Sequence, residues 1–306
     1  MRNLTLRQIR IFLSANKHMS FSRAAEELHI TAPAVSLQIK EMEEDMGVSL
    51  FRRENRKVEL TSAGEYFLLY ARRVSSTLNE ANTMMERLRG TQIKMLKIGV
   101  VSTAKYFLPR MLVEFKKDYP NLQIAIEVRN RQQLVELLRD GDIDIAIMGQ
   151  PPKEIDTRAE AFADHPHVFV ANPSNPLVGK LDLMPEVLNE FQFISREIGS
   201  GTRSIMERYF AEYGLSPIVS MEISSNETVK QAVSAGLGIS FVSLHTIGSE
   251  VINKELAILD IQNTPIIRTW HVVALRKRNA SQAAEAFRYF MLEKGREMLI
   301  AMFEKL

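Results

Sequence analysis

At two places in the sequence, residues with hydroxyl groups lie where a predicted strand ends and a predicted helix begins; we call these places corners. Ser102 and Thr103 follow the apolar run of residues 96–100, and GSGTR, residues 199–203, follows the apolar run FQFIS. GSGTR also offers glycines that permit close backbone approach and, in Arg203, a guanidinium suited to bidentate contact with carboxylate or phosphate. Because a helix N-terminus presents unpaired N–H groups and the positive end of the helix dipole, both corners predict anion binding.

A Ser-Thr pair at a helix start is more often only a cap, so a structural interpretation of these corners stays open. The binding interpretation is favoured because both corners follow strands of an α/β region, and ligands bind at the carboxyl ends of such strands. Asn226 and Glu227 open a third corner, and Lys105 either adds positive charge or covers the surface. The candidate ligand-binding residues are Ser102, Thr103, Ala104, Lys105, Gly149, Ser200, Gly201, Thr202, Arg203, Asn226 and Glu227.

A second concentration of charge lies near the N-terminus. The net charge of the chain is only +2, but residues 1–90 contain 14 Lys and Arg against 11 Asp and Glu. Four of these cations, Arg52, Arg53, Arg56 and Lys57, fall within six residues. Such a cluster favours binding to phosphate groups.

The composition argues against cysteine chemistry and metal binding. The chain has no cysteine, which excludes disulfides, iron–sulfur clusters and thiol catalysis. Its six histidines are scattered; His165 and His167 are near neighbours but have no Asp, Glu or Cys at metal-ligand spacing, so we interpret them as ordinary polar residues. We expect no metal and no cofactor. With no stretch of about 18 uncharged apolar residues and no signal peptide, the expected location is the cytoplasm.

The elements that position the basic cluster begin with two helices joined by a short turn. The second of these helices opens with Thr31 as its cap and stops at Gly47. Its buried face is predicted to contain Val35, Ile39, Met42 and Met46, and its opposite face to contain Ala32, Pro33, Ser36, Leu37 and Lys40. This is the pattern of a helix-turn-helix whose second helix enters the major groove of DNA. The following VSLFRRENRKVELT predicts a β-hairpin wing; the alternative is a generic three-helix domain with a solvated basic loop.

A long helix over residues 62–90 follows the wing. Its apolar residues alternate spacings of four and three over three heptads, which is typical of a coiled-coil seam. A seam attached to a small DNA-binding unit favours dimerisation over simple core packing, because a dimer reads two half-sites. The predicted dimerisation residues are Phe67, Ala71, Val74, Leu78, Ala81, Met85 and Leu88.

The remaining two thirds of the chain alternate strand-like and helix-like segments. This order is typical of an α/β architecture with a largely parallel sheet. The expected domains are residues 1–61, the linker helix 62–90 and a ligand-binding domain 91–306.

The chain resembles the LysR-type transcriptional regulators in Ser20 to Phe67, which reads SFSRAAEELHITAPAVSLQIKEMEEDMGVSLFRRENRKVELTSAGEYF. The resemblance continues through NRQQLVELLRDGDIDIAIMG and SAGLGISFVS. Within that family, STAKYF and REIGSGTR look most like the regulators of the Calvin-cycle (RuBisCO) operon, often called CbbR. The resemblance implies a winged helix-turn-helix, a coiled-coil linker helix and a two-lobed domain like the periplasmic solute-binding proteins. Lobe I would contain about residues 95–165 and 269–306 and lobe II about residues 166–268, with lobe crossings near residues 167–171 and 270–274. Effector would bind between the lobes, where the two hydroxyl-bearing corners, which belong to opposite lobes, would face each other.

The resemblance also implies roles for the DNA-binding residues. Pro33, Ser36 and Leu37 face the major groove, Arg52 and Arg53 lie near phosphate, and Arg56 reaches toward the minor groove. Two positions depart from the family pattern, which usually has Gln where this chain has Ala32 and often has Arg in place of Leu37. Ala32 can offer a base only apolar contact, for example with a thymine methyl group.

The leading hypothesis is a homo-oligomeric transcriptional regulator whose binding or bending of double-stranded promoter DNA responds to a small anionic metabolite. The resemblance implies a dimer of dimers and, for the subfamily named above, a phosphorylated sugar or an NADPH-like effector and control of carbon-fixation genes. RNA polymerase is expected as a further partner. Three alternatives remain: a carboxylate effector for another metabolic operon, a regulator that answers to a protein partner, and an enzyme on the two-lobed region. The enzyme hypothesis is weak because Glu197 near Ser200 is the best catalytic candidate that we find.

Overall fold

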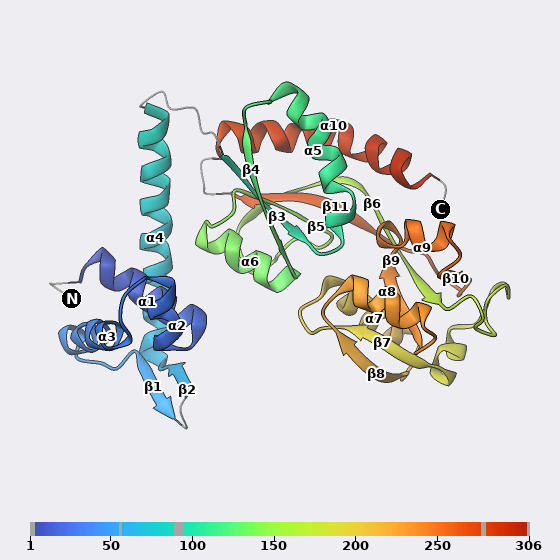
Figure 1. The fold of residues 1–306 in the computed structure, drawn as a ribbon, viewed down its shortest axis with the longest axis horizontal. Coiled ribbons are helices and arrows are strands. Elements are labelled where there is room, and N and C mark those ends of the chain that lie inside the picture. The colour runs from blue at the N-terminus through green and yellow to red at the C-terminus, as the bar shows by residue number, and fades with distance from the viewer. Residues whose placement is uncertain (1–3, 55–56, 89–94, 277–279, 305–306) are drawn as a thin grey trace. The chain divides into compact units, whose positions relative to one another are not determined.

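A computed structural model describes residues 4–54, 57–88, 95–276 and 280–304 (Figure 1). The chain divides into two compact units, Met1–Gly90 and Thr91–Leu306. No helix among the described residues is both long and apolar enough to cross a bilayer.

The N-terminal unit is a winged helix-turn-helix followed by a long helix. Its elements are α1 (Leu6–His18), α2 (Phe21–Glu27), α3 (Ala32–Met46), β1 (Phe51–Glu54), β2 (Lys57–Leu60) and α4 (Ser62–Leu88). The two strands pair antiparallel, with Phe51 opposite Leu60, and form the hairpin that projects from the helices in Figure 1. The predicted order of helices, wing and linker helix is therefore confirmed.

Helix α3 begins and ends where its sequence predicts. The hydroxyl of Thr31 accepts a hydrogen bond from the backbone N–H of Ala34 at 3.4 Å, and Gly47 ends the helix with a φ of +70°. Val35, Ile39 and Met42 are buried in the core of the unit and Met46 packs against it. The predicted buried face is confirmed, and the opposite face stays available to DNA.

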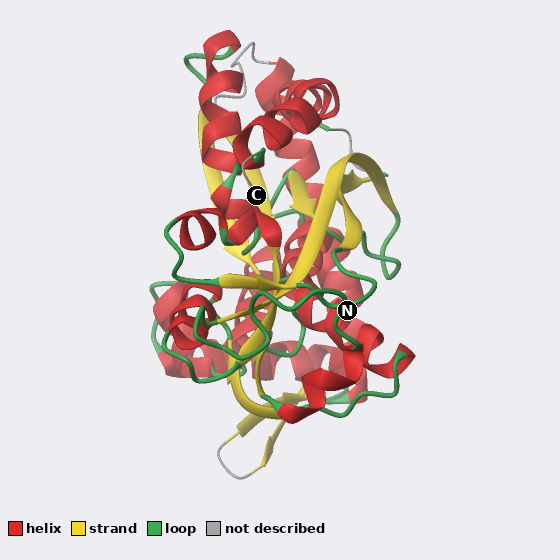
Figure 2. Cartoon of the chain, turned by 90° about the vertical axis from the view of Figure 1, so that its right-hand side faces the viewer, coloured by secondary structure: helices red, strands yellow, loops and turns green. Residues whose placement is uncertain are grey.

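The C-terminal unit is built on one continuous mixed sheet (Figure 2). Its strands are β3 (Met95–Val101), β4 (Gln123–Arg129), β5 (Ile145–Met148), β6 (Thr157–Ala171), β7 (Gln192–Arg196), β8 (Ile218–Ile223), β9 (Ile239–Ser243), β10 (Ala257–Leu259) and β11 (Ile266–Leu275). Its helices are η1 (Ala104–Tyr106), α5 (Leu108–Asp118), α6 (Arg131–Asp140), η2 (Pro185–Glu190), α7 (Gly201–Glu212), α8 (Asn226–Ser234), η3 (Leu244–Thr246), α9 (Gly248–Ile252) and α10 (Gln282–Phe303).

Two long antiparallel strands divide this sheet into two lobes. The strand order is β4-β3-β5-β11-β6-β9-β7-β8, with β10 also paired to β6. Residues 271–273 of β11 pair with β5 in lobe I, whereas residues 167–170 of β6 pair with β9 in lobe II. Strands β6 and β11 therefore cross between the lobes near His165, His167 and Trp270, close to the crossings implied by the family resemblance.

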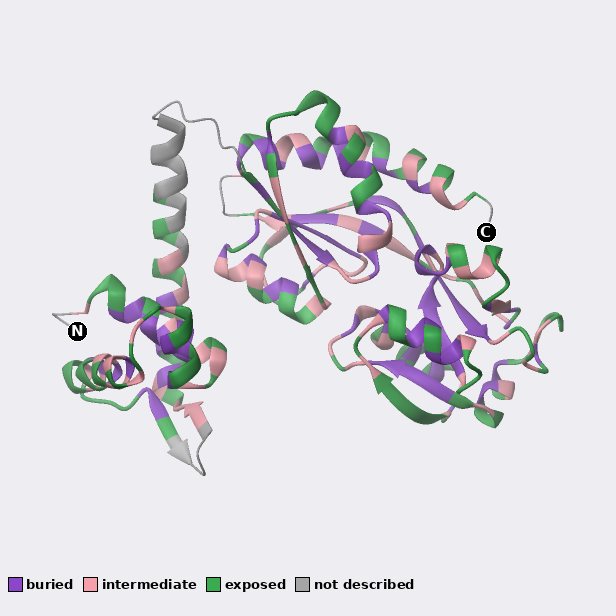
Figure 3. Cartoon of the chain, in the orientation of Figure 1, coloured by how far each residue is buried: buried purple, intermediate pink, exposed green. Residues whose placement is uncertain are grey.

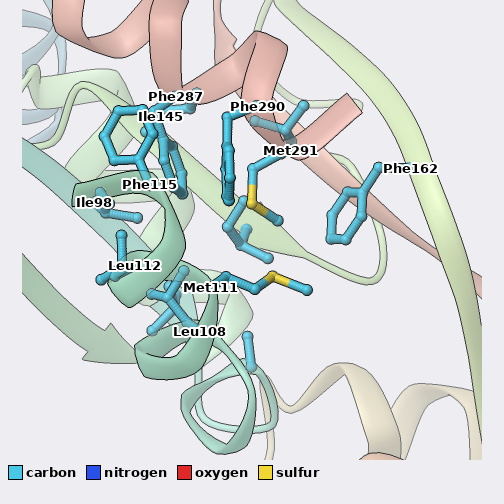
Figure 4. Close-up of a cluster of buried hydrophobic side chains, with 14 of the residues drawn as sticks. Ile98, Leu108, Met111, Leu112, Phe115, Ile145, Phe162, Phe287, Phe290 and Met291 are labelled. Atoms are coloured by element: carbon cyan, nitrogen blue, oxygen red, sulfur yellow. The ribbon is translucent and has the colours of Figure 1, made fainter. Parts of the chain in front are cut away.

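Lobe I is held together by a core between α5, α10 and the sheet (Figure 4). The ring of Phe115 lies 5.2 Å from that of Phe287 and 5.3 Å from that of Phe290, measured between ring centroids. Each buried aromatic ring stabilises the lobe by about 1.5–3 kcal/mol through removal of its apolar surface from water. In Figure 3 the central strands β5 and β9 are buried, and this rigid base positions the loops at their ends.

Candidate functional site

The exposed face of α3 is the candidate DNA-reading surface. Pro33, Leu37 and Lys40 are exposed, with 55% of Leu37 accessible, and Ser36 and Ala32 are partly exposed. A shallow groove lined in part by Pro33, Ser36, Leu37 and Lys40 runs along this face. Lys40 pairs with Glu44 one turn on, at 3.5 Å. The exposed leucine offers apolar contact to a base edge where a charged residue would offer hydrogen bonds.

Arg52 is the member of the predicted basic cluster whose side chain the structure describes. The guanidinium of Arg52 donates to the carboxylate of Glu59 on the opposite strand, at 2.8 Å from Nη2. This cross-strand pair is solvent-exposed, so DNA phosphate can compete for Arg52 at little cost. Arg56 and the side chains of Arg53 and Lys57 lie outside the described residues.

The predicted dimer seam along α4 divides into two parts. Phe67 and Ala71 are buried in the core of their own unit, and the Phe67 ring lies edge-on to Phe12 with ring centroids 4.8 Å apart. These two residues are therefore not available to a second chain, which corrects the prediction for the first heptad. Val74, Leu78 and Ala81 are exposed, at 39% for Val74 and 36% for Leu78, whereas the side chains of Met85 and Leu88 lie outside the described residues. The part of the seam that is exposed to a second chain begins at Val74.

A cleft of about 460 Å³, counting the space open to solvent, lies between the two lobes of the C-terminal unit. Its walls come from residues at the carboxyl ends of β3, β4, β5 and β7, and its floor from β6. The described lining residues include two arginines and no Asp or Glu; they are Val101, Ser102, Thr103, Asn130, Arg131, Met148, Gly149, Gln150, His165, His167, Arg196, Ser200, Gly201, Thr202 and Ile205. Six of the eleven candidate ligand-binding residues line the cleft.

The GSGTR corner forms the lobe II wall. Helix α7 starts at Gly201, and the side chain of Ser200 at its N-cap makes no capping hydrogen bond. Gly199 adopts a φ of +88°, and a Cβ there would lie 3.0 Å from Oε1 of Gln132 in lobe I, so glycine suits both the turn and the close approach. The uncapped N–H groups of the first turn of α7 are left for a ligand or water.

The Ser102-Thr103 corner forms the lobe I wall, and it does not act as a helix cap. Thr103 is buried and makes no side-chain capping bond to η1. The Ser102 hydroxyl instead receives hydrogen bonds from lobe II, from Nη2 of Arg196 at 3.2 Å and from Nδ2 of Asn226 at 3.4 Å. These contacts join the two lobes beside the cleft.

Arg196 is the main functional residue that the sequence interpretation missed. It ends β7, its side chain is 3% exposed, and it lines the cleft. Besides Ser102, its guanidinium donates to Asn226, to the carbonyl of Ser224 at 3.1 Å and to both carboxylate oxygens of Glu197. The available signal was a charged residue at the end of the buried strand FQFIS, where parallel strands place their ligands.

Arg203 does not lie where the sequence analysis expected it. Its guanidinium pairs with Glu207 at 2.7 Å and with Glu222, and it also donates to the carbonyl of Arg196. These bonds turn it away from the described lining of the cleft, because a side chain three residues into α7 points to a different face than the helix N-terminus. Arg196 therefore takes the position predicted for Arg203.

Four further candidates lie beside the cleft without lining it. Ala104 is fully buried, and Asn226 contacts Arg196 and Ser102. Glu227 accepts a hydrogen bond from the Tyr106 hydroxyl at 2.5 Å and lies 3.6 Å from Nζ of Lys105. Lys105 is therefore held by a carboxylate of the opposite lobe, and the two lobes are joined by charge as well as by hydrogen bonds.

Sequence analysis also missed one further arginine and two histidines that line the cleft. Arg131 lines the cleft and pairs with Glu154, whose pKa it lowers to about 2. His165 and His167, interpreted from sequence as ordinary polar residues, are buried and line the cleft floor. Burial lowers the pKa of His167 to about 3 and that of His165 well below its ordinary value, so both rings are neutral.

The described lining of the cleft suits an anion and contains no constellation for bond-breaking chemistry. Hydroxyls, helix N–H groups and Arg196 converge on it, whereas Glu197, the candidate for catalysis, is engaged by Arg196. Among the described residues, no group of three or more His, Cys, Asp or Glu side chains could hold a metal ion. The arrangement is that of a binding site.

Known proteins similar to this chain share both units. The model of the LysR substrate binding domain matches residues 89–296, and that of the bacterial regulatory helix-turn-helix protein, lysR family, matches residues 6–65. The transcriptional regulator CfxR of Cupriavidus necator is 42% identical over 98% of this chain and 94% of its own length. The RuBisCO operon transcriptional regulator of Allochromatium vinosum is 41% identical over 97% of this chain and 98% of its own.

Solved structures agree with these relatives. The regulatory domain of CcmR from Synechocystis PCC6803, in complex with 2-PG, is 38% identical, with a TM-score of 0.63 over 65% of this chain and 95% of that one. A cysteine-to-serine mutant of OxyR from Corynebacterium glutamicum, bound to hydrogen peroxide, is 28% identical, with a TM-score of 0.61 over 99% of this chain and 97% of that one. The relatives are named as regulators of transcription, and the enzyme hypothesis is set aside. Because family models match both units and a curated relative is 42% identical over 98% of the chain, the chain belongs to the LysR family of bacterial transcriptional regulators.

Proposed function

We propose that this chain regulates transcription of a carbon-fixation operon and that a small anion carrying a phosphate or carboxylate group, bound in the cleft, modulates its action on promoter DNA. The observation that supports the effector most directly is the convergence of the uncapped start of α7 with Arg196 and Ser102 across the cleft. A single anion at this point contacts both lobes. The identities of the curated relatives support the choice of operon.

The effector acts on the balance between lobe arrangements. In the present arrangement Arg196 of lobe II donates to Ser102 of lobe I and is partly neutralised by Glu197. An anion that binds the guanidinium and the α7 N–H groups competes for these bonds, so the two lobe arrangements differ in effector affinity. That difference in affinity is what allows the effector to shift the population of DNA-binding states.

The phosphate group is the favoured head group. Helix N-termini bind phosphate well, and the structurally similar CcmR regulatory domain is seen with 2-PG. A carboxylate effector, which would serve another metabolic operon, fits the same donors and is the second candidate. A phosphorylated sugar offers the most hydrogen-bonding groups to a cleft lined with hydroxyls, amides and imidazoles.

The assembly proposed for the regulator is a dimer of dimers. The exposed part of the α4 seam, from Val74 to Ala81, supports pairing of two chains. Paired chains present two α3 helices to two half-sites, which compensates for the modest affinity of one small DNA-binding unit. Activation would also require contact with RNA polymerase, and work on promoters would place the protein in the bacterial cytoplasm.

Chromatin capture with the full-length protein tests the operon. We expect the recovered sites to lie upstream of carbon-fixation genes, and recovery only at unrelated operons would contradict the proposal. Titration of the recovered promoter fragment with protein, in the presence of a phosphorylated sugar or an unphosphorylated carboxylate, then separates the two candidate head groups. An affinity or DNase footprint that neither class of compound changes would exclude an anionic effector for this cleft.

A further inference from the structure

His165 is held rigidly at the floor of the cleft. Its ring lies on β6 between the lobes, is 4% exposed, and stacks on Trp270 with ring centroids 3.7 Å apart and planes 16° from parallel. Nε2 is hydrogen-bonded to the Ser243 hydroxyl at 2.9 Å, whereas Nδ1 has no partner among the described residues. A buried nitrogen without a partner is costly, so the free Nδ1 suggests a group that is supplied from outside the chain.

Gly149 packs closely against this nitrogen. A Cβ at residue 149 would lie 2.6 Å from Nδ1 of His165, closer than a side chain can approach. Gly149 lines the cleft, as does His165. With glycine at this position, the side of the ring that carries Nδ1 meets no side chain from residue 149. Nδ1 is buried in the present arrangement, and a ligand reaches it as the lobes part.

The chemistry of this nitrogen selects an uncharged polar partner. The Ser243 hydroxyl can donate to Nε2 or accept from it, so Nδ1 can be either the acceptor or the donor of the neutral ring. A hydroxyl group complements both tautomers, whereas a carbonyl or an oxyanion complements only one. Because burial keeps His165 and His167 neutral, neither ring offers a positive charge to balance a second anion at the floor.

We infer that His165 is a ligand-binding residue and that its Nδ1 binds a hydroxyl group of the effector, so that the effector is an anion bearing at least one hydroxyl. The inference rests on the proposed anion site, because the anion at α7 and Arg196 places the rest of the molecule toward the floor. It adds a specificity element to the cleft. The anionic end provides affinity for any phosphate, and His165 discriminates among them.

Two small phosphates that differ only in hydroxyls test this assignment. Calorimetric titration of the full-length protein with glycerol 3-phosphate and with propyl phosphate measures what the hydroxyls add, and inorganic phosphate reports the anion site by itself. We expect glycerol 3-phosphate to bind roughly fivefold to tenfold more tightly than propyl phosphate, the contribution of one buried hydrogen bond. In His165→Phe, which keeps a ring against Trp270, and in Gly149→Ala, which crowds Nδ1, this ratio should fall to about one.

His245 provides the matched control. It is a buried histidine of the same aromatic cluster and is not among the described residues that line the cleft, and His245→Gln should keep the ratio. Equal affinities in the wild type, or a preference that survives in both His165→Phe and Gly149→Ala, would overturn the assignment of His165. Tighter, His165-dependent binding of 2-phosphoglycolate, which carries a second anion and no hydroxyl, would also overturn it. If the wild type binds none of these phosphates, the proposed anion site itself is wrong.

Discussion

Nη2 of Arg196 in lobe II lies 3.2 Å from Oγ of Ser102 in lobe I, at the wall of the cleft. The two residues are 94 positions apart in sequence, and each follows or ends a strand of the same continuous sheet. The hydrogen bond that joins the lobes at this wall is therefore made by the same guanidinium that gives the cleft its positive charge. An anion that binds Arg196 would change both the charge of the cleft and this contact between the lobes.

Replacement of Arg196 should weaken effector binding far more than replacement of Arg203. Arg196→Gln removes a charge-assisted donor from the cleft, and we expect about a 10- to 100-fold loss of affinity for a phosphorylated effector. Arg203→Gln removes an arginine of the same lobe that pairs with Glu207 and Glu222, and its affinity should stay within about threefold of the wild type. Calorimetry measures both, with thermal denaturation as the check on folding. An equal loss in the two variants would show that Arg203, not only Arg196, reaches the ligand.

Base preference and overall DNA affinity should respond to different residues. Leu37→Ala changes an exposed apolar contact of α3, so the preferred base pair should change while the salt dependence of binding stays the same. Arg56→Ala should weaken binding to every sequence and reduce the slope of log affinity against log salt by about one. Titrations of a randomised half-site at several salt concentrations distinguish the two. A salt slope that is unchanged in Arg56→Ala would contradict the role of the wing.

The two halves of the α4 pattern should give different phenotypes. Leu78→Glu alters an exposed seam residue, so sedimentation should show smaller oligomers while the DNA-binding unit keeps its thermal stability. Phe67→Ala removes a ring that packs on Phe12, and it should lower the free energy of unfolding of that unit by about 3–5 kcal/mol. A Leu78→Glu protein of unchanged oligomeric state would exclude this part of the helix from the dimer seam.

The buried histidines should make the C-terminal unit less stable in mild acid. Burial lowers the pKa of His167 to about 3, that of His245 to about 4 and that of His165 well below its ordinary value. The unfolded chain binds protons at these rings near pH 6.5 and the folded chain does not, so stability is complete above pH 6.5 and is lost as the pH falls. Each ring can lower the free energy of unfolding by up to about 1.4 kcal/mol per pH unit.

Urea unfolding between pH 7 and pH 5 measures this dependence. This pH range reports on the histidines and not on Glu154. The pKa of Glu154 is lowered to about 2, so its contribution to stability is lost only as the pH falls below the ordinary carboxylate pKa. In His245→Gln, which keeps an acceptor for the Trp270 Nε1–H, the slope should decrease by about one proton. Constant stability from pH 7 to pH 5 would mean that these rings are accessible to water in the folded protein.

Much of the architecture could be predicted from sequence because it depends on local apolar periodicity and on the residues that begin and end each helix. Thr31 and Gly47 determine where α3 begins and ends, and the spacing of Val35, Ile39 and Met42 determines its buried face. The corners at Ser102 and Ser200 were also predictable, because parallel strands end at a common edge. These features depend on a few neighbouring residues at a time.

The tertiary structure decided which side chains meet. GSGTR contains an arginine at the expected corner, but the turn of α7 sends Arg203 to Glu207 and Glu222, and the guanidinium in the cleft comes from Arg196. Phe67 and Ala71 follow the same heptad pattern as Leu78, yet only the packing of the first unit shows that they are already buried. His165 and His167 look ordinary as sequence, and only the crossing of β6 between the lobes places them at the cleft floor. Sequence spacing determines the direction of a side chain within its own element, whereas its partners depend on how distant elements pack.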